Sequence, residues 1–309
     1  MIIYGAGMAG LMAGNYLKKF SPTIHEVQSS LPNNHGALLR FKTNVCGEIT
    51  GIPFKKVKIN KAICFDGSIY TEPNIKFSNM YSQKVTGEII NRSIGNLDAG
   101  ERYIAPYDYI NQMASKLDIE YDSKLTTDFL QSQKNSNHAP VISTIPMPML
   151  MDMVGWQKPE FKWKSITSVW GKINSPKTDV YQTIYYPDPK VPYYRISITG
   201  DTYIAEYDGK INIDDAISMS ATHLRDFGIN GTVEDVNIKE QNYGKLVPID
   251  DKVRKEFILY MTDEYRVYSL GRFATWRQIL LDDLARDLKV IESMIDYRDD
   301  YSKRLSIIK

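Results

Sequence analysis

The chain opens with Met1-Ile2-Ile3-Tyr4-Gly5-Ala6-Gly7-Met8-Ala9-Gly10, and this stretch decides the fold. Residues 1–4 are apolar and rich in β-branched side chains, which is typical of a buried strand. Apolar side chains then recur at helical spacing through residues 11–20. A glycine-rich turn between a strand and a helix is typical of a dinucleotide-binding βαβ unit. We therefore expect a Rossmann-like α/β domain to begin here.

Each glycine of this turn has a physical role. Gly5 lets the chain reverse, Gly7 lets the backbone approach a pyrophosphate without a Cβ, and Gly10 lets the helix pack closely on the strand. The amides of Met8 and Ala9 then lie at the helix N-terminus, where the helix dipole favours an anion. The turn therefore predicts a site for the pyrophosphate of a dinucleotide.

An acidic residue follows at the spacing that this site requires. Residues 23–25 read as a second short strand, which ends in Glu26, 21 residues beyond Gly5. A carboxylate at that position binds the ribose hydroxyls of a dinucleotide. We therefore expect Glu26 to contact the cofactor.

Composition sets the class of protein. The 309 residues are 43% hydrophobic and 24% charged, which is typical of a globular protein and excludes a disordered chain. The net charge of +1 gives no overall field to attract nucleic acid or an anionic membrane, so any anion must be bound locally. The two cysteines, Cys46 and Cys64, cannot form a disulfide framework, and no Cys/His cluster has metal-ligand spacing. We expect a cytoplasmic protein with no metal and no membrane span.

The run GAGMAGLMAGNYL with HEVQ after it resembles the FAD-binding start of the glutathione-reductase-like flavoproteins. Within them it most resembles the group of amine oxidases, protoporphyrinogen oxidases and UDP-galactopyranose mutases. The resemblance implies that the cofactor is FAD. It also implies a flavin contact for Arg40, which follows His35-Gly36-Ala37 where the group has Gly and Arg. The alternative for Arg40 is a surface arginine.

The C-terminal segment resembles the second flavin motif of the same group. Residues 265–270 read as a strand, 271–276 as a turn beginning Gly271-Arg272, and 279–295 as an amphipathic helix. The resemblance places the helix N-terminus at the flavin N1 and O2 atoms, where it stabilises the negative charge of the reduced ring. It places Arg272 beside the pyrophosphate or the ring, and Asp282 at the acidic position near the helix start. The alternative to a cofactor contact is an ion pair between Arg272 and Asp282 or Asp283.

The middle of the chain predicts a second, strand-rich region. Residues 141–146 resemble the strand end at which the chain of these flavoproteins leaves the FAD domain. Residues 181–207 read as antiparallel strands broken at 187–189 and 199–201. Within them Pro192-Tyr193-Tyr194-Arg195-Ile196 resembles the Pro-Tyr-Thr-Arg strand of the mutases, whose arginine lies in the active site. The alternative is an ordinary alternating strand.

Other segments predict further elements. Residues 106–117 and 214–227 have helical spacing, 250–256 read as an exposed helix start, and 131–138 read as a solvent-facing turn.

We therefore expect two interleaved domains. A discontinuous FAD-binding domain comprises residues 1–60, 105–146 and 262–309, and an inserted antiparallel β-rich (α+β) substrate domain comprises 61–104 and 147–261. Tyrosines are in surplus, 21 against 10 phenylalanines, and four of them fall within residues 185–194. Tyrosine combines an apolar ring with a polar tip, so we expect this stretch to line a substrate pocket.

Three functions follow from the resemblance. The first is hydride transfer to flavin N5 from a C–N bond of an amine or amino-acid-like substrate. The second is the non-redox chemistry of a UDP-galactopyranose mutase, and the third is flavin binding without turnover. The Lys-, Ile- and Asn-rich composition also resembles that of phage proteins, which adds a modified nucleobase to the possible substrates, with nucleic acid a partner only through that base.

The predicted site residues fall into two groups. The catalytic candidates are Tyr185, Tyr194 and Arg195, and the cofactor-binding candidates are Gly5, Gly7, Met8, Ala9, Gly10, Glu26, Arg40, Gly271, Arg272 and Trp276.

Overall fold

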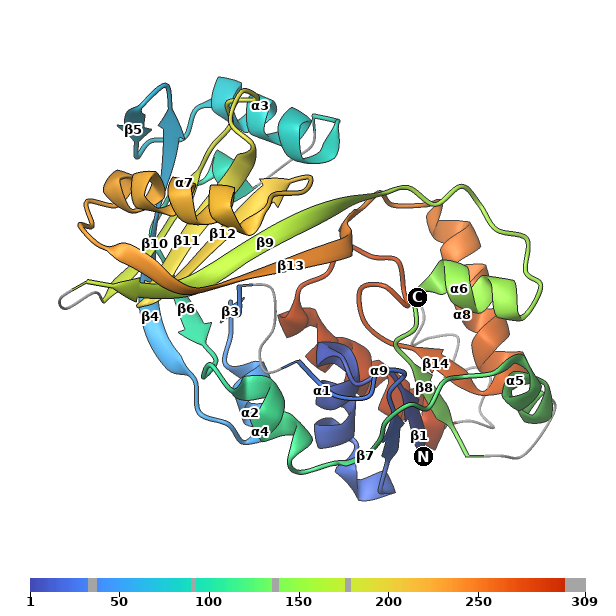
Figure 1. The fold of residues 1–309 in the computed structure, drawn as a ribbon. Helices are drawn as coiled ribbons and strands as arrows, with labels where there is room; N and C mark the ends of the chain where they lie inside the picture. Colours follow the sequence, from blue (N-terminus) through green and yellow to red (C-terminus); the bar gives the residue numbers. More distant parts are fainter. Residues whose placement is uncertain (33–37, 90–92, 135–138, 176–178, 298–309) are drawn as a thin grey trace.

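The computed structural model describes residues 1–32, 38–89, 93–134, 139–175 and 179–297, and these form two sheets (Figure 1). The first sheet has five parallel strands in the order β14-β8-β1-β2-β7. Its strands are β1 (Ile2–Tyr4), β2 (Thr23–His25), β7 (Asp118–Glu120), β8 (Val141–Ser143) and β14 (Val267–Ser269). This is the doubly wound arrangement in which a dinucleotide binds beyond the carboxyl ends of the strands.

Helices cover both faces of the parallel sheet. Buried side chains pack on one face from α1 (Met8–Tyr16), α2 (Val45–Thr50), α4 (Tyr109–Ala114) and α9 (Leu284–Asp296). The other face is covered by α5 (Thr127–Gln133), α6 (Met147–Met153) and α8 (Asp251–Tyr265). Short 3-10 turns are η1 (Lys18–Phe20), η2 (Ser93–Gly95) and η3 (Leu281–Asp283). The sheet between them is buried on both faces, as parallel sheets require.

The second sheet has nine strands, in the order β13-β9-β12-β11-β10-β4-β6-β3 with β5 paired to β4. Neighbouring strands run antiparallel except β4 and β10, which are parallel. The strands are β3 (Arg40–Phe41), β4 (Lys55–Phe65), β5 (Ser68–Tyr70), β6 (Gly100–Ile104), β9 (Trp163–Asn174), β10 (Val180–Tyr185), β11 (Tyr193–Gly200), β12 (Thr202–Asp208) and β13 (Thr232–Leu246).

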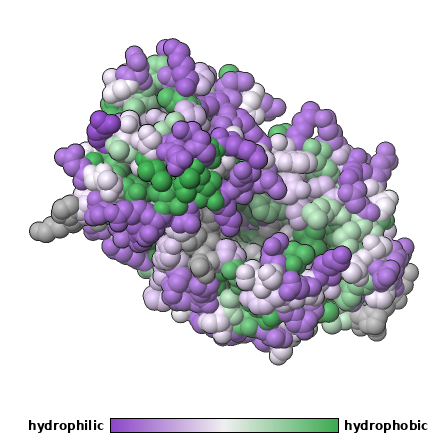
Figure 2. All heavy atoms as spheres, viewed as in Figure 1, coloured by the Kyte–Doolittle hydropathy of each residue, from purple (hydrophilic) through white to green (hydrophobic). Residues whose placement is uncertain are grey.

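Two helices pack on opposite faces of this second sheet. Ala62 and Cys64 of β4 lie in the apolar cluster under α7 (Ile213–Asp226), whereas Ile63 lies in the cluster under α3 (Ile75–Thr86). Figure 2 shows that the surface is hollowed between the two lobes and that an apolar patch lies on the lobe that carries α7. The exposed large apolar side chains of α7 are Ile213 and Ile217.

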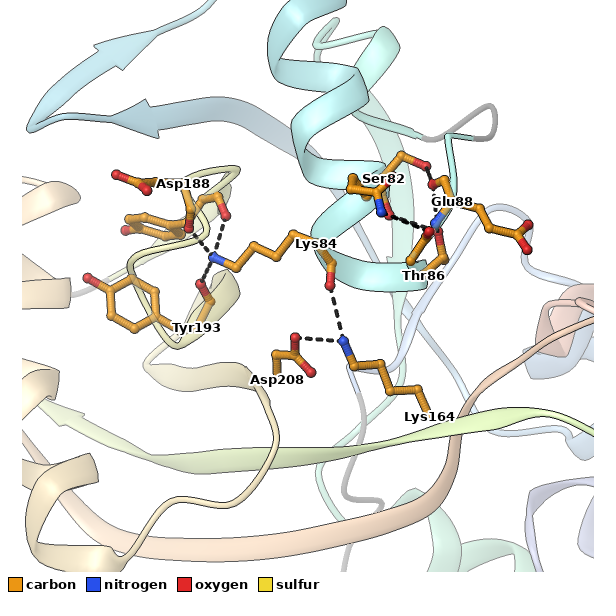
Figure 3. Close-up of polar contacts among 11 residues, drawn as sticks. Ser82, Lys84, Thr86, Glu88, Lys164, Asp188, Tyr193 and Asp208 are labelled. Atoms are coloured by element: carbon orange, nitrogen blue, oxygen red, sulfur yellow. Dashed lines mark hydrogen bonds and ion pairs between the residues drawn. The ribbon is translucent and has the colours of Figure 1, made fainter.

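A lysine fixes the C-terminal end of α3 to the sheet (Figure 3). Lys84 Nζ donates to the carbonyl oxygens of Tyr186, Asp188 and Tyr193 at 2.7–2.9 Å. Lys164 Nζ, from β9, donates to the Lys84 carbonyl at 3.2 Å and to the Asp208 carboxylate at 2.6 Å. Two ammonium groups thus join α3 to strands β9 and β12 and to the β10–β11 connection.

The predicted class of fold is confirmed: a parallel α/β sheet is combined with a largely antiparallel second sheet. The strand over residues 23–25, the broken antiparallel strands of residues 181–207 and the helix over residues 214–227 are also confirmed. No helix in the described ranges is both long enough and apolar enough to cross a membrane.

Three local predictions are wrong. Residues 131–133 form the end of helix α5 and not a turn. The helix forms because Leu130 is buried and because Thr126 caps its start by accepting from the Phe129 amide at 3.2 Å. Residues 135–138 lie outside the described part. The helix expected over residues 106–117 spans only Tyr109–Ala114. The helix expected from residue 279 begins at Leu284, because Asp283 accepts the Leu280 amide at 2.8 Å and closes a 3-10 turn first.

Candidate cofactor and substrate site

The glycine turn joins β1 to α1 in a conformation that few other residues could adopt. Gly5 has φ of +95° and its amide donates to the His25 carbonyl at 2.8 Å, which joins the ends of β1 and β2. A Cβ at Gly10 would lie 1.8 Å from the Gly5 carbonyl oxygen. The fold itself therefore requires glycine at both positions, independently of any ligand.

Gly7 differs from both, because neither its backbone conformation nor any described residue near it requires glycine. A Cβ at Gly7 would have no atom of the described residues within 4 Å, and its φ of −70° is accessible to any residue. The amides of the first helical turn, including those of Met8 and Ala9, have no intrahelical partner, and Gly7 at the N-cap has no side chain to accept from them. Open space beside free amides at a helix N-terminus fits a bound phosphate.

Glu26 lies directly beside this turn. Its Oε2 accepts the Ala6 amide at 2.6 Å and its Oε1 accepts the Gln28 amide at 3.0 Å. The side chain is buried next to the glycines, and each carboxylate oxygen keeps further acceptor capacity. The buried carboxylate thus lies beside the glycine turn, and its contact with a ribose stays a prediction.

The C-terminal turn packs against the start of α1. Gly271, after β14, has φ of +91°, and a Cβ there would lie 2.8 Å from the Ala9 Cβ. Asp282 of η3 accepts the amides of Lys42 and Thr43 at 3.1 and 2.7 Å. Two segments far apart in sequence, residues 5–10 and 271–283, therefore border one site with the segment after β3.

Arg272 points from this turn toward the second sheet. Its Nη2 donates to the Gly244 carbonyl of β13 at 3.0 Å. It lines a cavity of about 200 Å³ with Lys245, Thr86 of α3 and residues 278–280. The two cations Arg272 and Lys245 thus face a space between the C-terminal turn and the end of β13.

Arg40 is neither at the surface nor directed at the glycine turn. From β3 its guanidinium donates to the hydroxyls of Thr183 and Thr199, at 2.6 and 2.9 Å, and to the carbonyls of Gln182 and Ile198. Burial, and then the charge of Arg195, lower the pKa of Arg40 to about 9. Arg40 therefore crosses from β3 to β10 and β11. A contact with the cofactor stays a prediction, and His35-Gly36-Ala37 lie outside the described residues.

Trp276 belongs to a packed core. It is 1% exposed, its Nε1 donates to the Val247 carbonyl at 2.9 Å, and its ring lies edge-on to Phe161 and Trp163. The structure thus gives Trp276 a packing role, and its predicted contact with FAD is untested.

The three catalytic candidates lie together on the α3 face of the second sheet. A register shift in the pairing of β11 with β12 falls between Tyr193 and Arg195. Tyr185 and Tyr194 are buried, and both rings lie edge-on to Tyr81 of α3. Only Arg195 remains open to solvent, with its side chain 27% exposed.

Glu206 of β12 is a charged partner that the sequence reasoning missed. It is buried, it pairs with Arg195 Nε, and it accepts from the Tyr194 hydroxyl at 3.2 Å. Burial alone would raise the pKa of Glu206, but Arg195 and Lys245 hold it below its usual value. A lone glutamate within the apolar strand Tyr203-Ile204-Ala205-Glu206-Tyr207 was the available signal, because buried carboxylates are nearly always paired.

The fold combines a five-stranded parallel sheet, a glycine turn and a largely antiparallel second sheet, and it is shared with solved structures at low sequence identity. No family model matches the sequence, and no curated protein matches it. Solved structures do match. A protein from Exiguobacterium sp. 255-15, provisionally assigned as a protoporphyrinogen oxidase, has a TM-score of 0.61 at 9% identity, over 96% of this chain and 98% of that one.

Two further structures share the fold. An oxidoreductase from Methanosarcina mazei has a TM-score of 0.58 at 10% identity, over 94% of this chain and 99% of that one. Aklavinone-11 hydroxylase, solved with FAD and aklavinone, has a TM-score of 0.53 at 11% identity, over 96% of this chain and 62% of that one. The likeness is therefore one of fold, and activity must be argued from the site.

Proposed function

We propose that this protein is an FAD-dependent oxidoreductase that oxidises a C–N bond of an amine or amino-acid-like substrate. The observation that carries the proposal is the open cradle at Gly7, where space and unpaired amides meet beside the buried carboxylate of Glu26. The second support is the contact of Gly271 with Ala9, which brings the C-terminal turn to the same place.

The chain's own residues would divide the work of holding the cofactor. The amides after Gly7 would bind the pyrophosphate, and Glu26 would accept from the adenosine ribose. The turn at Gly271 would cover the linker between the two halves of the cofactor. FAD, when bound, supplies hydride acceptance at flavin N5.

The cavity beside Arg272 would orient the substrate. Lys245 and Arg272 face the same space. Together with Arg195 they are three cations against the buried carboxylate of Glu206, and this excess of positive charge favours a bound carboxylate, which supports an amino-acid-like substrate. Arg195 is paired with Glu206, so its charge is not available for a diphosphate. This pairing weakens the alternative of a nucleotide-sugar mutase.

Anaerobic titration of the FAD-loaded protein tests the proposal. Amines, amino acids, modified nucleobases and UDP-galactopyranose are added in turn, and bleaching of the flavin absorbance is followed. Bleaching by an amine or amino acid is the expected result. Turnover of UDP-galactopyranose only after dithionite reduction would instead establish the mutase, and a bound flavin that no compound bleaches or turns over would leave a protein that binds FAD without catalysis.

A variant pair tests the carboxylate site. Lys245→Met should raise KM for an amino-acid substrate about tenfold or more, because a charge-assisted bond is lost, and should leave KM for the corresponding amine unchanged. Lys210→Met is the control, since the side chain of Lys210 is 83% exposed. An equal effect on both substrates would refute the assignment of Lys245.

A further inference from the structure

A second cavity lies at the outer edge of the parallel sheet. It has a volume of about 440 Å³, and its walls come from α8, β14, the segment after Gly271 and α9. β14 is the last strand in the sheet order and, among the described strands, pairs with β8 alone. The cavity therefore borders the edge of β14, and neither the glycine turn nor Glu26 is among the residues known to line it.

The polar part of this cavity is cationic. Four cationic side chains line it: Arg254, Lys255, Arg277 and Arg286. Among the described lining residues, Asp287 alone carries a carboxylate. Arg277 is paired with Asp287.

The cations of α8 are only partly neutralised. Arg254 and Lys255 share the single carboxylate of Asp251, with Lys255 Nζ at 2.8 Å. Among the described residues, four cations against these two carboxylates leave an excess of two positive charges around the space. Such an excess matches a dianion.

The remaining wall is apolar. Ile258 faces Val290, Ile291 and Met294 across the cavity between α8 and α9. Ser269 also lies on the wall, and its buried hydroxyl has no hydrogen-bond partner within the described ranges. A buried polar group without a partner is costly, which is a physical reason for a ligand or water here.

We propose that this cavity binds a phosphate monoester that carries an apolar or aromatic group of about nucleoside size. The two excess positive charges complement the phosphate dianion, and the apolar helix faces cover the organic group. The volume lies within the range of small-molecule sites, which is roughly 300–1,000 Å³. Inorganic phosphate would make no contact with the apolar wall, and a nucleoside without phosphate would carry no charge to pair with the cations.

Isothermal titration of the full-length, FAD-saturated protein tests the proposal. Saturation with FAD keeps the probes out of the cofactor site. The probes are uridine 5′-monophosphate, phenyl phosphate, uridine and inorganic phosphate. We expect saturable binding of at least one of the two organic phosphates, and binding of uridine and inorganic phosphate weaker by about tenfold or more.

Variants locate the binding. Lys255→Gln and Arg286→Gln should each weaken the organic phosphate by about tenfold, since each removes one charge-assisted contact. Lys289→Gln is the matched control, because Lys289 is exposed on α9 and is not among the lining residues. Far-UV circular dichroism and flavin content should be unchanged in all three.

Three results would overturn the proposal. The first is that neither organic phosphate binds saturably below about 10 mM. The second is that the affinity for the organic phosphate is unchanged in both variants. The third is that inorganic phosphate or uridine binds as tightly as the organic phosphates.

Discussion

Two buried ionisable side chains of the second sheet and α7 differ in charge because their partners differ. Glu206 has Arg195, Tyr194 and Lys245 around it and stays ionised. His223 of α7 is fully buried; its Nδ1 contacts the Tyr203 hydroxyl, and its Nε2 has no partner in the described part of the chain. Burial lowers the pKa of His223 to about 3, so the ring is neutral in the folded protein near pH 7.

We predict that His223 makes the protein sensitive to acid. Its pKa is lower in the folded than in the unfolded chain, so the unfolded state binds the proton first as the pH falls below about 6.5. The free energy of unfolding should fall by about 2 kcal/mol between pH 7.5 and pH 5 from this group alone. Urea denaturation of the wild type and of His223→Leu at several pH values measures the difference, and parallel pH profiles would contradict the prediction.

We also predict a large effect of Glu206→Gln. The change leaves Arg195 without its carboxylate, and because that side chain is 27% exposed, we expect a loss of about 2–3 kcal/mol, below the usual cost for a fully buried pair. Glu240→Gln, which breaks an exposed pair with Lys210, should cost less than about 1 kcal/mol. Equal losses in the two variants, read from urea denaturation, would refute the role of burial.

At the scale of elements, a single side chain determines how α3 meets the sheet. Burial lowers the pKa of Lys84 to about 8, but three carbonyl oxygens accept from its ammonium group, so the charged form persists near neutral pH. Through these bonds the end of α3 is joined to the β10–β11 connection and to the start of β11 (Figure 3). Side chains of α3 in turn pack against Tyr185 and Tyr194.

We expect Lys84→Met to cost about 2–4 kcal/mol, because it leaves three carbonyls, two in this connection and one at the start of β11, without their donor. The control is Lys76→Met on the same helix, where the lysine is exposed, with an expected change within about 0.5 kcal/mol. Hydrogen exchange should accelerate over residues 185–194 only in the first variant. Unchanged exchange there would show that α3 is held by apolar packing instead.

Local patterns predicted the elements whose signal lies in neighbouring residues. The glycine turn, strand β2 and the start of helix α8 after Asp250 all depend on a few consecutive side chains. The long strands β9 and β13 were not predicted as such, because their residues alternate poorly and their pairing is shifted at two places. Likewise the pairing of Arg195 with Glu206 depends on the register of β11 against β12. The contact of Gly271 with Ala9 depends on the packing of the C-terminal turn against the N-terminal helix α1, which are far apart in the sequence.

At the scale of the whole molecule, the beginning and the end of the chain build one side of the site and the second sheet builds the other. Gly271 abuts α1, Asp282 binds the segment after β3, and Arg272 reaches β13. The near-zero net charge is therefore compatible with a charged cofactor, since the binding groups are amides and a few local cations.

The central claim is that the space at Gly7 holds FAD, and an equilibrium titration of FAD against Gly7→Val tests it most directly. A Cβ there would meet no atom of the described residues within 4 Å, so the variant should still fold in the absence of flavin, with its melting temperature lowered by at most a few degrees because valine is a poorer N-cap than glycine. It should bind FAD about tenfold or more weakly than the wild type, because the side chain fills the cradle. The control Gly95→Val, at an exposed glycine, should bind normally. A folded wild type that takes up no FAD, or a Gly7→Val protein with unchanged affinity, would contradict the account.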